Sequence, residues 1–318
     1  MQALVFDGGA PALRELPRPA PGPGEALVRV RMAGVCNTDL EIVGGYMGFS
    51  GVLGHEFCGV VEASDDPSWL GQRVAGEINQ ACGHCDLCAR GLGRHCPERS
   101  VLGIVEKPGC FAEYLTLKLD SLHRLPPELS DARASFVEPT AAAYEILEQV
   151  AIGPEHRVAV LGDGKLGLLI AQVILTTGCK PHVIGRHPKK LELAERFGAR
   201  VAEPETLSPK SFDCVIEATG SPSGLQRALG LTRPRGTLVL KSTYHAKLEL
   251  DAAPIVIDEL SIVGSRCGPF EPAIAALSSN AINPDPMIDA VFPLAQAPEA
   301  LARAAEPGVL KVLLEVSV

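Results

Sequence analysis

The densest group of potential metal ligands in the sequence is a set of four cysteines, Cys82, Cys85, Cys88 and Cys96. Their pattern, C-x2-C-x2-C-x7-C, has short spacers that let neighbouring thiolates converge on one ion, and four sulfurs in a tetrahedron suit zinc. Four protein ligands fill the coordination sphere and leave no position for a substrate. We therefore predict that this loop, about residues 80–97, binds a structural zinc ion and takes no part in turnover.

Other roles for these cysteines are less compatible with the pattern. Two disulfides between such crowded residues would be strained, and the usual iron-sulfur run has a shorter last spacer. His84 and His95 lie among the cysteines and could each replace one of them as a ligand, although the four thiolates already suffice.

A glycine motif of the form G-x-G-x-x-G marks a second site. It reads Gly162-Asp163-Gly164-Lys165-Leu166-Gly167 and lies between a strand expected at residues 156–162 and a helix expected at residues 165–178. The first glycine permits the tight turn, the second lets a pyrophosphate approach the backbone, and the third lets the helix pack against the strand. The helix N-terminus then faces the phosphates. The motif predicts dinucleotide binding at this turn.

The end of the next strand indicates which dinucleotide is bound. NAD enzymes place an acidic residue about 20 positions after the glycines, where it binds the ribose 2′-hydroxyl. This chain has Gly185-Arg186-His187 there, with Lys189 and Lys190 just beyond. Glycine leaves room for a 2′-phosphate and an arginine fork can bind it, although the lysines are equally compatible with a solvated helix face. We predict NADP as the cofactor, with NAD as the less favoured alternative.

The composition excludes several classes of partner. A net charge of −9 argues against nucleic acid, because phosphate backbones need a basic face. No window reaches the roughly 20 apolar residues that span a bilayer, and the N-terminus lacks the basic leader and long apolar run of a signal peptide. We therefore expect a cytoplasmic protein whose ten cysteines are metal ligands and buried thiols.

The elements that must position these motifs fall into two kinds. Short alternating strands are expected at residues 25–35, 57–64 and 72–78, so the first third is β-rich. From residue 156 onward, strands alternate with helices, which indicates βαβ units and a parallel sheet covered on both faces. The tail after residue 290 reads as strand, helix, strand. The length of 318 residues is consistent with two such domains.

The first third also holds an isolated Cys36 in "GVCNTDLE" and an isolated His55 in "GVLGHEFCGVV". Together with the four-cysteine loop, the glycine motif, "FVEPTAAAYEIL", "VIEATG" and "GVLKVLLEV", these segments cover nearly the whole chain. In that order they resemble the zinc-dependent alcohol dehydrogenases of the medium-chain dehydrogenase/reductase superfamily.

The resemblance implies an α/β protein with a β-rich GroES-like catalytic domain and a doubly wound Rossmann domain with a parallel sheet. We expect the catalytic domain at residues 1–140 and 284–318, and the Rossmann domain at residues 141–283. The resemblance also implies a homodimer or homotetramer, and the strand candidates at 236–242 and 260–266 are suited to extend a sheet across a two-fold axis.

The resemblance also implies a catalytic zinc ion held by Cys36, His55 and a third ligand. The matching position is Glu138, as in the polyol, sugar and threonine branches, while Glu56 resembles a family glutamate that binds the metal or stands behind it. Without the resemblance, Glu138 is explained as a carboxylate near a helix N-terminus, ahead of Pro139. Ligation by Glu138, by Glu56 or by both in exchange is left open.

Two further residues complete the expected catalytic set. Thr38 matches the family's relay hydroxyl, which would pass a proton from the substrate oxygen, and Asp39 would orient His55. With two zinc ions per chain, the expected reaction is hydride transfer between NADP(H) and a small alcohol or carbonyl substrate, such as a polyol or sugar.

Two rival functions remain at this stage. A metal-free enone or quinone reductase of the same superfamily would leave Cys36, His55 and Glu138 without a joint role. A non-catalytic protein that senses NADP would have no need of the relay hydroxyl of Thr38.

Overall fold

We analysed a computed structural model of the chain, which describes residues 1–203, 206–243 and 250–316. The chain forms two compact units, one of residues Met1–Glu138 with Pro284–Val318 and one of residues Pro139–Asn283. The domain boundary expected from the sequence lies after residue 140, two residues later than the boundary between these units. No helix of the described residues is long and apolar enough to cross a membrane.

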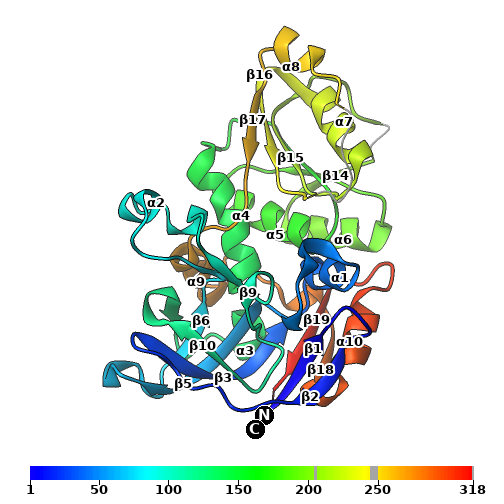
Figure 1. The fold of residues 1–318 in the computed structure, drawn as a ribbon. Coiled ribbons are helices and arrows are strands. Elements are labelled where there is room, and N and C mark those ends of the chain that lie inside the picture. The colour runs from blue at the N-terminus through cyan, green and yellow to red at the C-terminus, as the bar shows by residue number, and fades with distance from the viewer. Residues whose placement is uncertain (204–205, 244–249, 317–318) are drawn as a thin grey trace. The chain divides into compact units, whose positions relative to one another are not determined.

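The first unit is built on a mixed sheet with the strand order β11-β6-β5-β3-β19-β18, and β10 also pairs with β3. These strands are β3 (Glu25–Gly34), β5 (Glu56–Ser64), β6 (Arg73–Gly76), β10 (Tyr114–Lys118), β11 (Leu122–Arg124), β18 (Ile288–Pro293) and β19 (Lys311–Glu315). The β-rich character predicted for the first third is confirmed. The pairing of β19 with β3 brings the C-terminal segment into this sheet (Figure 1).

Two small sheets and short helices complete the first unit. The sheets are β1 (Gln2–Phe6), β2 (Ala12–Glu15) and β4 (Gly51–Val52), and β7 (Asn79–Gln80), β8 (Ser100–Leu102) and β9 (Glu106–Lys107). The helices are α1 (Asn37–Val43), α2 (Asp86–Ala89), α3 (Asp131–Ala134) and α10 (Ala297–Ala304). Single 3-10 turns are η1 (Tyr46–Gly48), η2 (Pro67–Trp69), η3 (Gly93–His95), η4 (Leu119–Ser121), η6 (Asp285–Met287) and η7 (Leu294–Gln296).

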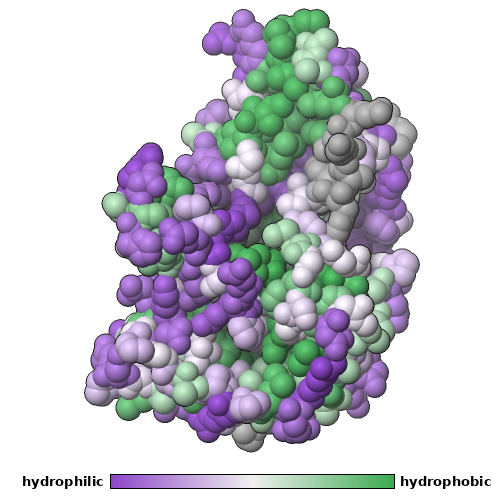
Figure 2. All heavy atoms as spheres, viewed as in Figure 1, coloured by the Kyte–Doolittle hydropathy of each residue, from purple (hydrophilic) through white to green (hydrophobic). Residues whose placement is uncertain are grey.

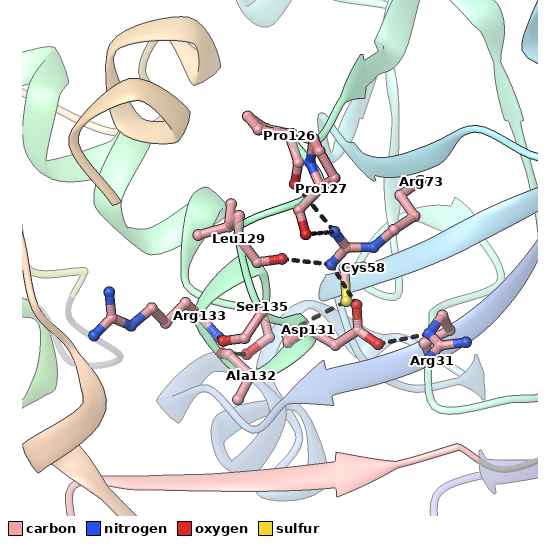
Figure 3. Close-up of polar contacts among 11 residues, drawn as sticks. Arg31, Cys58, Arg73, Pro126, Pro127, Leu129, Asp131, Ala132, Arg133 and Ser135 are labelled. Carbon is pink, nitrogen blue, oxygen red and sulfur yellow. Dashed lines mark hydrogen bonds and ion pairs between the residues drawn. The ribbon is translucent and has the colours of Figure 1, made fainter. Parts of the chain in front are cut away.

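A cluster of charged side chains ties α3 to the main sheet. The carboxylate of Asp131 accepts hydrogen bonds from Arg73 on β6 and Arg31 on β3, each at 2.5 Å. Arg73 also donates to the carbonyl oxygens of Pro126 and Leu129, and the Cys58 thiol donates to the carbonyl oxygen of Asp131. Figure 3 shows the guanidinium of Arg73 at the centre of this network. The network fixes the chain just before α4 (Val137–Gln149), where Glu138 lies.

The second unit contains a sheet of six parallel strands in the order β14-β13-β12-β15-β16-β17. The strands are β12 (Val158–Leu161), β13 (His182–Ile184), β14 (Arg200–Ala202), β15 (Phe212–Glu217), β16 (Thr232–Leu240) and β17 (Ser261–Gly264). The helices that accompany them are α5 (Lys165–Leu175), α6 (Pro188–Phe197), α7 (Pro222–Leu231), α8 (Ala253–Ile257) and α9 (Phe270–Ser278), with most of α4. The predicted doubly wound parallel sheet is confirmed.

The apolar composition of β12 and α5 explains the packing of this unit. All four residues of β12 are buried, as expected for a central strand covered on both faces. Eight of the residues of α5, from Gly167 to Ile174, are buried as well. A core cluster that includes Leu161, Val215, Leu225 and Leu238 joins the sheet to α7.

Candidate active site

The four cysteines of the predicted zinc loop come together in the first unit. The Sγ–Sγ distances are 3.4 Å between Cys85 and Cys88, 3.8 Å between Cys85 and Cys96, and 3.9 Å between Cys82 and Cys88. A tetrahedral zinc ion with Zn–S bonds of about 2.3 Å separates its sulfurs by about 3.8 Å. The four thiols are free of disulfides, so the donor set and its spacing both fit a closed zinc site. A hydrogen bond from the backbone N–H of His84 lowers the pKa of Cys82 to about 6, which prepares a thiolate.

A second ligand group forms where β3 and β5 pair. Gly34 at the end of β3 lies opposite Glu56 at the start of β5, so Cys36 and His55, just beyond these positions, are brought together. One ligand atom each from Cys36, His55 and Glu56 lie within 4.8 Å of one another. His55 and Glu56 are buried and Cys36 is half-buried. A thiolate, an imidazole and a carboxylate are a suitable donor set for zinc, and three protein ligands leave a fourth position for substrate.

Asp39 holds two members of this group in place. Its fully buried carboxylate accepts a hydrogen bond from the backbone N–H of Cys36 at 2.8 Å and lies 3.1 Å from Nδ1 of His55. With Nδ1 turned to Asp39, Nε2 is the nitrogen left to bind a metal. Burial disfavours the charged imidazole, but the Asp39 carboxylate outweighs burial and raises the pKa of His55 well above its ordinary value.

Thr38 lies in the first turn of α1, with Oγ1 3.8 Å from Sγ of Cys36. This places a hydroxyl beside the ligand group, on the same short helix as Asp39. Cys36 is the N-cap of this helix, and its backbone N–H donates to the carboxylate of Asp39. The sequence segment "CNTD" thus supplies a ligand, a hydroxyl and an orienting carboxylate from one turn.

Of the two candidate glutamates, Glu56 belongs to the ligand group and Glu138 does not. Glu138 lies in the first turn of α4, half-buried, outside the set of ligand atoms that cluster within 4.8 Å. Its position agrees with a carboxylate favoured by the helix dipole. Among the described residues, the structure therefore groups Glu56, rather than Glu138, with Cys36 and His55.

A buried lysine that sequence reasoning missed lies behind Glu56. Nζ of Lys311, on β19, forms an ion pair with Oε2 of Glu56, and both side chains are almost fully buried. The Lys311 ammonium also lies 5.4 Å from the centre of the Phe136 ring. The signal was present in "GVLKVLLEV", where a lysine interrupts an apolar strand, because a lysine at such a position requires a buried partner.

The glycine motif forms the turn between β12 and α5. Gly162 has a φ of 119°, and a Cβ on Gly167 would lie 1.9 Å from the carbonyl oxygen of Gly162. Only glycine permits this close approach of the helix to the strand. Gly164 precedes the first turn of α5, in which Lys165 and Leu166 lie, and a Cβ at Gly164 would meet open space. The turn thus has the form that a pyrophosphate requires.

The expectation that Gly185 leaves room beside the second strand is wrong, because Asp163 fills that space. A Cβ on Gly185 would lie 2.3 Å from Oδ2 of Asp163. This oxygen accepts hydrogen bonds from the backbone N–H groups of Arg186 and His187, each at 2.8 Å, and Nδ1 of His187 lies 2.9 Å from Oδ1. Asp163 occupies a variable position of the glycine motif, and no spacing rule predicts this contact.

Comparisons with known proteins agree with this architecture. The family model for the alcohol dehydrogenase GroES-like domain matches residues 22–127, and the model for zinc-binding dehydrogenases matches residues 166–279. An erythritol/L-threitol dehydrogenase from Mycolicibacterium smegmatis is 31% identical, with 93% of this chain and 92% of the relative covered. The chain belongs to the zinc-dependent alcohol dehydrogenase family of the medium-chain dehydrogenase/reductase superfamily.

Solved structures extend the likeness to both units. A zinc-binding dehydrogenase from Sinorhizobium meliloti bound to NADP has a TM-score of 0.89 and 29% identity, with 99% of this chain and 98% of the other covered. An alcohol dehydrogenase from Escherichia coli CFT073 in complex with NADH has a TM-score of 0.92 and 28% identity, with 99% of each chain covered. This chain is a zinc-dependent, NAD(P)-linked dehydrogenase.

Proposed function

We propose that the protein transfers a hydride between NADP(H) and a polyol or a related polar alcohol. The observation that carries the proposal is the ligand group of Cys36, His55 and Glu56, which provides three protein ligands in a buried site. Three ligands are typical of catalytic zinc sites, whereas the four cysteines of the loop are typical of structural ones.

The roles of the chain's own residues follow from their contacts. Zinc bound at this site would act as a Lewis acid toward the substrate oxygen. Asp39 orients His55 through Nδ1 and fixes the backbone of Cys36, so two ligands share one buried support. Thr38 offers a hydroxyl that accepts or returns the proton of the substrate alcohol. Lys311 balances the charge of Glu56 in the buried site.

The choice of NADP rests on Arg186. Its guanidinium is exposed at the end of β13, with the exposed Lys189 on the first turn of α6. Cations in this place attract the two charges of a 2′-phosphate, and the planar arginine can bind two phosphate oxygens at once. One structural relative was solved with NADP and another with NADH, so either dinucleotide is compatible with the fold.

The choice of a polar alcohol rests on the ligands and on a relative. At Glu138 the chain has a carboxylate where the classical alcohol dehydrogenases have a second thiolate, and this is the pattern that the resemblance associates with polyol and sugar substrates. The erythritol/L-threitol dehydrogenase that is 31% identical to this chain is named for polyol substrates. We therefore place the substrate among small polyols and their keto sugars.

The edge of the parallel sheet supports assembly into a homodimer. β17 is the last strand of that sheet and pairs only with β16 among the described residues. Val256 and Ile257 of the adjacent α8 are 75% and 76% exposed, and Ile262 on β17 is 39% exposed. Figure 2 shows apolar side chains gathered over α8 and the neighbouring α7. An exposed apolar edge of this kind is suited to pairing with a second copy across a two-fold axis.

We place the enzyme in the cytoplasm, where thiols stay reduced. All ten cysteines are free in the structure, including Cys85 and Cys88, whose sulfurs lie 3.4 Å apart. In an oxidising compartment, such pairs would be exposed to disulfide formation.

A substrate panel tests the proposed reaction. Purified zinc-loaded protein is assayed by nicotinamide absorbance with C4 to C6 polyols, simple alcohols and activated alkenes, in both directions and with both cofactors. We expect turnover of one or more polyols with NADP(H). Turnover of alkenes alone, persisting after zinc is removed, would instead support a metal-free reductase.

Sedimentation of the parent and of Val256→Asp tests the proposed dimer. We expect the parent to sediment as a dimer and Val256→Asp as a monomer. A parent that sediments as a monomer would refute the dimer.

A further inference from the structure

Asp163 places a carboxylate where an NAD enzyme carries the acid of its second strand. In such enzymes the acid at the end of the second strand binds the ribose 2′-hydroxyl. Here Gly185 follows that strand directly, and the Asp163 carboxylate occupies the space that a Cβ of residue 185 would need. The acid has not been lost from this part of the molecule. It is supplied by the glycine turn instead.

The carboxylate of Asp163 is ionised and retains one free acceptor direction. Burial alone would raise the pKa of Asp163, but hydrogen bonds from His187 and from the backbone N–H of Arg186 outweigh burial and lower it. A carboxylate offers about four acceptor directions. Oδ2 accepts the backbone N–H groups of Arg186 and His187, and Nδ1 of His187 lies 2.9 Å from Oδ1 and 3.0 Å from Oδ2, so Oδ1 keeps an acceptor direction beyond this one ring contact. The side chain remains 9% exposed, so one further donor can reach it.

The carboxylate of Asp163 and the guanidinium of Arg186 have opposite effects on the binding of a 2′-phosphate. A ribose 2′-hydroxyl can donate a hydrogen bond to the remaining acceptor direction. A 2′-phosphate has no such proton at neutral pH when it is fully ionised, and its charge is repelled by the carboxylate. The exposed guanidinium of Arg186 attracts the same phosphate. The two backbone N–H groups are already occupied by Asp163, so only side chains are left to bind a 2′-phosphate here.

We propose that Asp163 is a specificity-determining residue, which accepts the 2′-hydroxyl of NAD(H) and opposes the 2′-phosphate of NADP(H). Asp163 and Arg186 then set the cofactor ratio together, and the enzyme binds both dinucleotides. This inference rests on the proposed function in one respect, namely that the adenosine ribose lies at the glycine turn.

Asp163→Asn separates this role from a purely structural one. Asparagine has the same shape, so its Oδ1 can accept from both backbone N–H groups, while Nδ2 faces the imidazole of His187. The change removes the negative charge and replaces an acceptor by a donor. Any loosening of the turn lowers the affinity for both cofactors together, whereas the proposed role changes their ratio.

The test measures binding of adenosine fragments that carry no nicotinamide. The zinc-loaded parent and Asp163→Asn are titrated by calorimetry with 5′-AMP and with 2′,5′-ADP. We expect the dissociation constant of 2′,5′-ADP, divided by that of 5′-AMP, to be lower by about tenfold or more in Asp163→Asn than in the parent. The reason is that the variant loses the charge-assisted hydrogen bond to the 2′-hydroxyl and the repulsion of the 2′-phosphate. Asp213→Asn is the matched control, because that carboxylate also accepts a backbone N–H but lies at the start of β15.

The outcomes are distinguishable. An equal loss of affinity for both fragments, or an unchanged ratio, would overturn the role of Asp163 while leaving the proposed function intact. A parent that binds neither fragment would overturn both. If Asp163→Asn does not fold, Asp163→Ser serves the same purpose, and its ratio must shift in the same direction.

Discussion

The carboxylate of Glu56 forms a buried ion pair with the ammonium of Lys311, which lies 255 residues further along the chain. The pair joins the first residue of β5 to the first residue of β19, and Glu56 also belongs to the ligand group with Cys36 and His55. This ion pair thus connects the C-terminal strand to the candidate zinc site. A Cβ on Gly34 would meet both partners, at 2.5 Å from Oε2 of Glu56 and 2.8 Å from Cε of Lys311, so this glycine is what gives the pair its space.

Replacing the lysine tests what this pair contributes. Lys311→Met keeps the length of the side chain but leaves the Glu56 carboxylate buried without its cation. Breaking a buried ion pair in this way costs about 3–5 kcal/mol. We expect the free energy of unfolding in urea to fall by that amount in zinc-free protein, and by less in zinc-loaded protein, because zinc supplies positive charge to the same carboxylate. Lys311→Arg, which keeps the charge, should lose less than Lys311→Met. An equal loss with and without zinc would show that Glu56 does not face the metal.

The exposed guanidinium of Arg186 is predicted to discriminate between the cofactors. Arg186→Ala should weaken NADP binding about tenfold, the value of one charge-assisted phosphate contact, and leave NAD binding nearly unchanged. Titration of the zinc-loaded enzyme with each dinucleotide gives both constants. Lys180→Ala is the matched control, because Lys180 is exposed just before β13, at the other end of the strand. Equal affinity of the parent for NADP and NAD would refute the NADP preference.

The four-cysteine loop is predicted to stabilise the fold. Cys82→Ser should lower the zinc content by one ion per chain and lower the melting temperature, by about 2–4 °C for each kcal/mol lost from a unit of this size. Differential scanning calorimetry and metal analysis measure the two effects. His95→Ala is the control, since the exposed His95 belongs to none of the ligand groups that the described residues form. Loss of zinc from the His95 variant would mean that this histidine is a ligand.

The Asp131 cluster gives the stability a defined dependence on pH. Burial alone would raise the pKa of Asp131, but hydrogen bonds from Arg31 and Arg73 outweigh it and lower the pKa. The stability that this carboxylate contributes is therefore present above its unfolded pKa, near 3.8, and is lost as the pH falls through the lower folded value. Asp131→Asn should lower the free energy of unfolding by about 1–3 kcal/mol at pH 7, and the difference should shrink below pH 4. Asp120→Asn, at an exposed position, should show no such trend. A difference that is constant from pH 7 to pH 3 would contradict the account.

Much of the fold was predictable because its signals are local. The strand at residues 156–162, the glycines of the turn and the helix after them are set by neighbouring residues, and β12 and α5 appear there. The same holds for the four cysteines, whose short spacers restrict them to one small loop. Alternation along residues 25–35 likewise predicted β3.

The contacts that sequence could not provide are those between distant segments. The pairing of Lys311 with Glu56 depends on β19 joining β3 in the main sheet. The proximity of Glu56 to Cys36 and His55 depends on the register that sets Gly34 opposite Glu56. The filling of the Gly185 position by Asp163 depends on the distance between two turns of the parallel sheet. Each is fixed by tertiary packing, which has no signature in spacing.

The most direct test of the central claim is the zinc content and turnover of Cys36→Ser. We expect two zinc ions per chain in the parent and one in the variant. We also expect the variant to lose hydride transfer to the substrate found in the panel, with its affinity for NADP unchanged. Turnover that persists in Cys36→Ser at one zinc ion per chain would show that the ligand group of Cys36, His55 and Glu56 is not the catalytic centre.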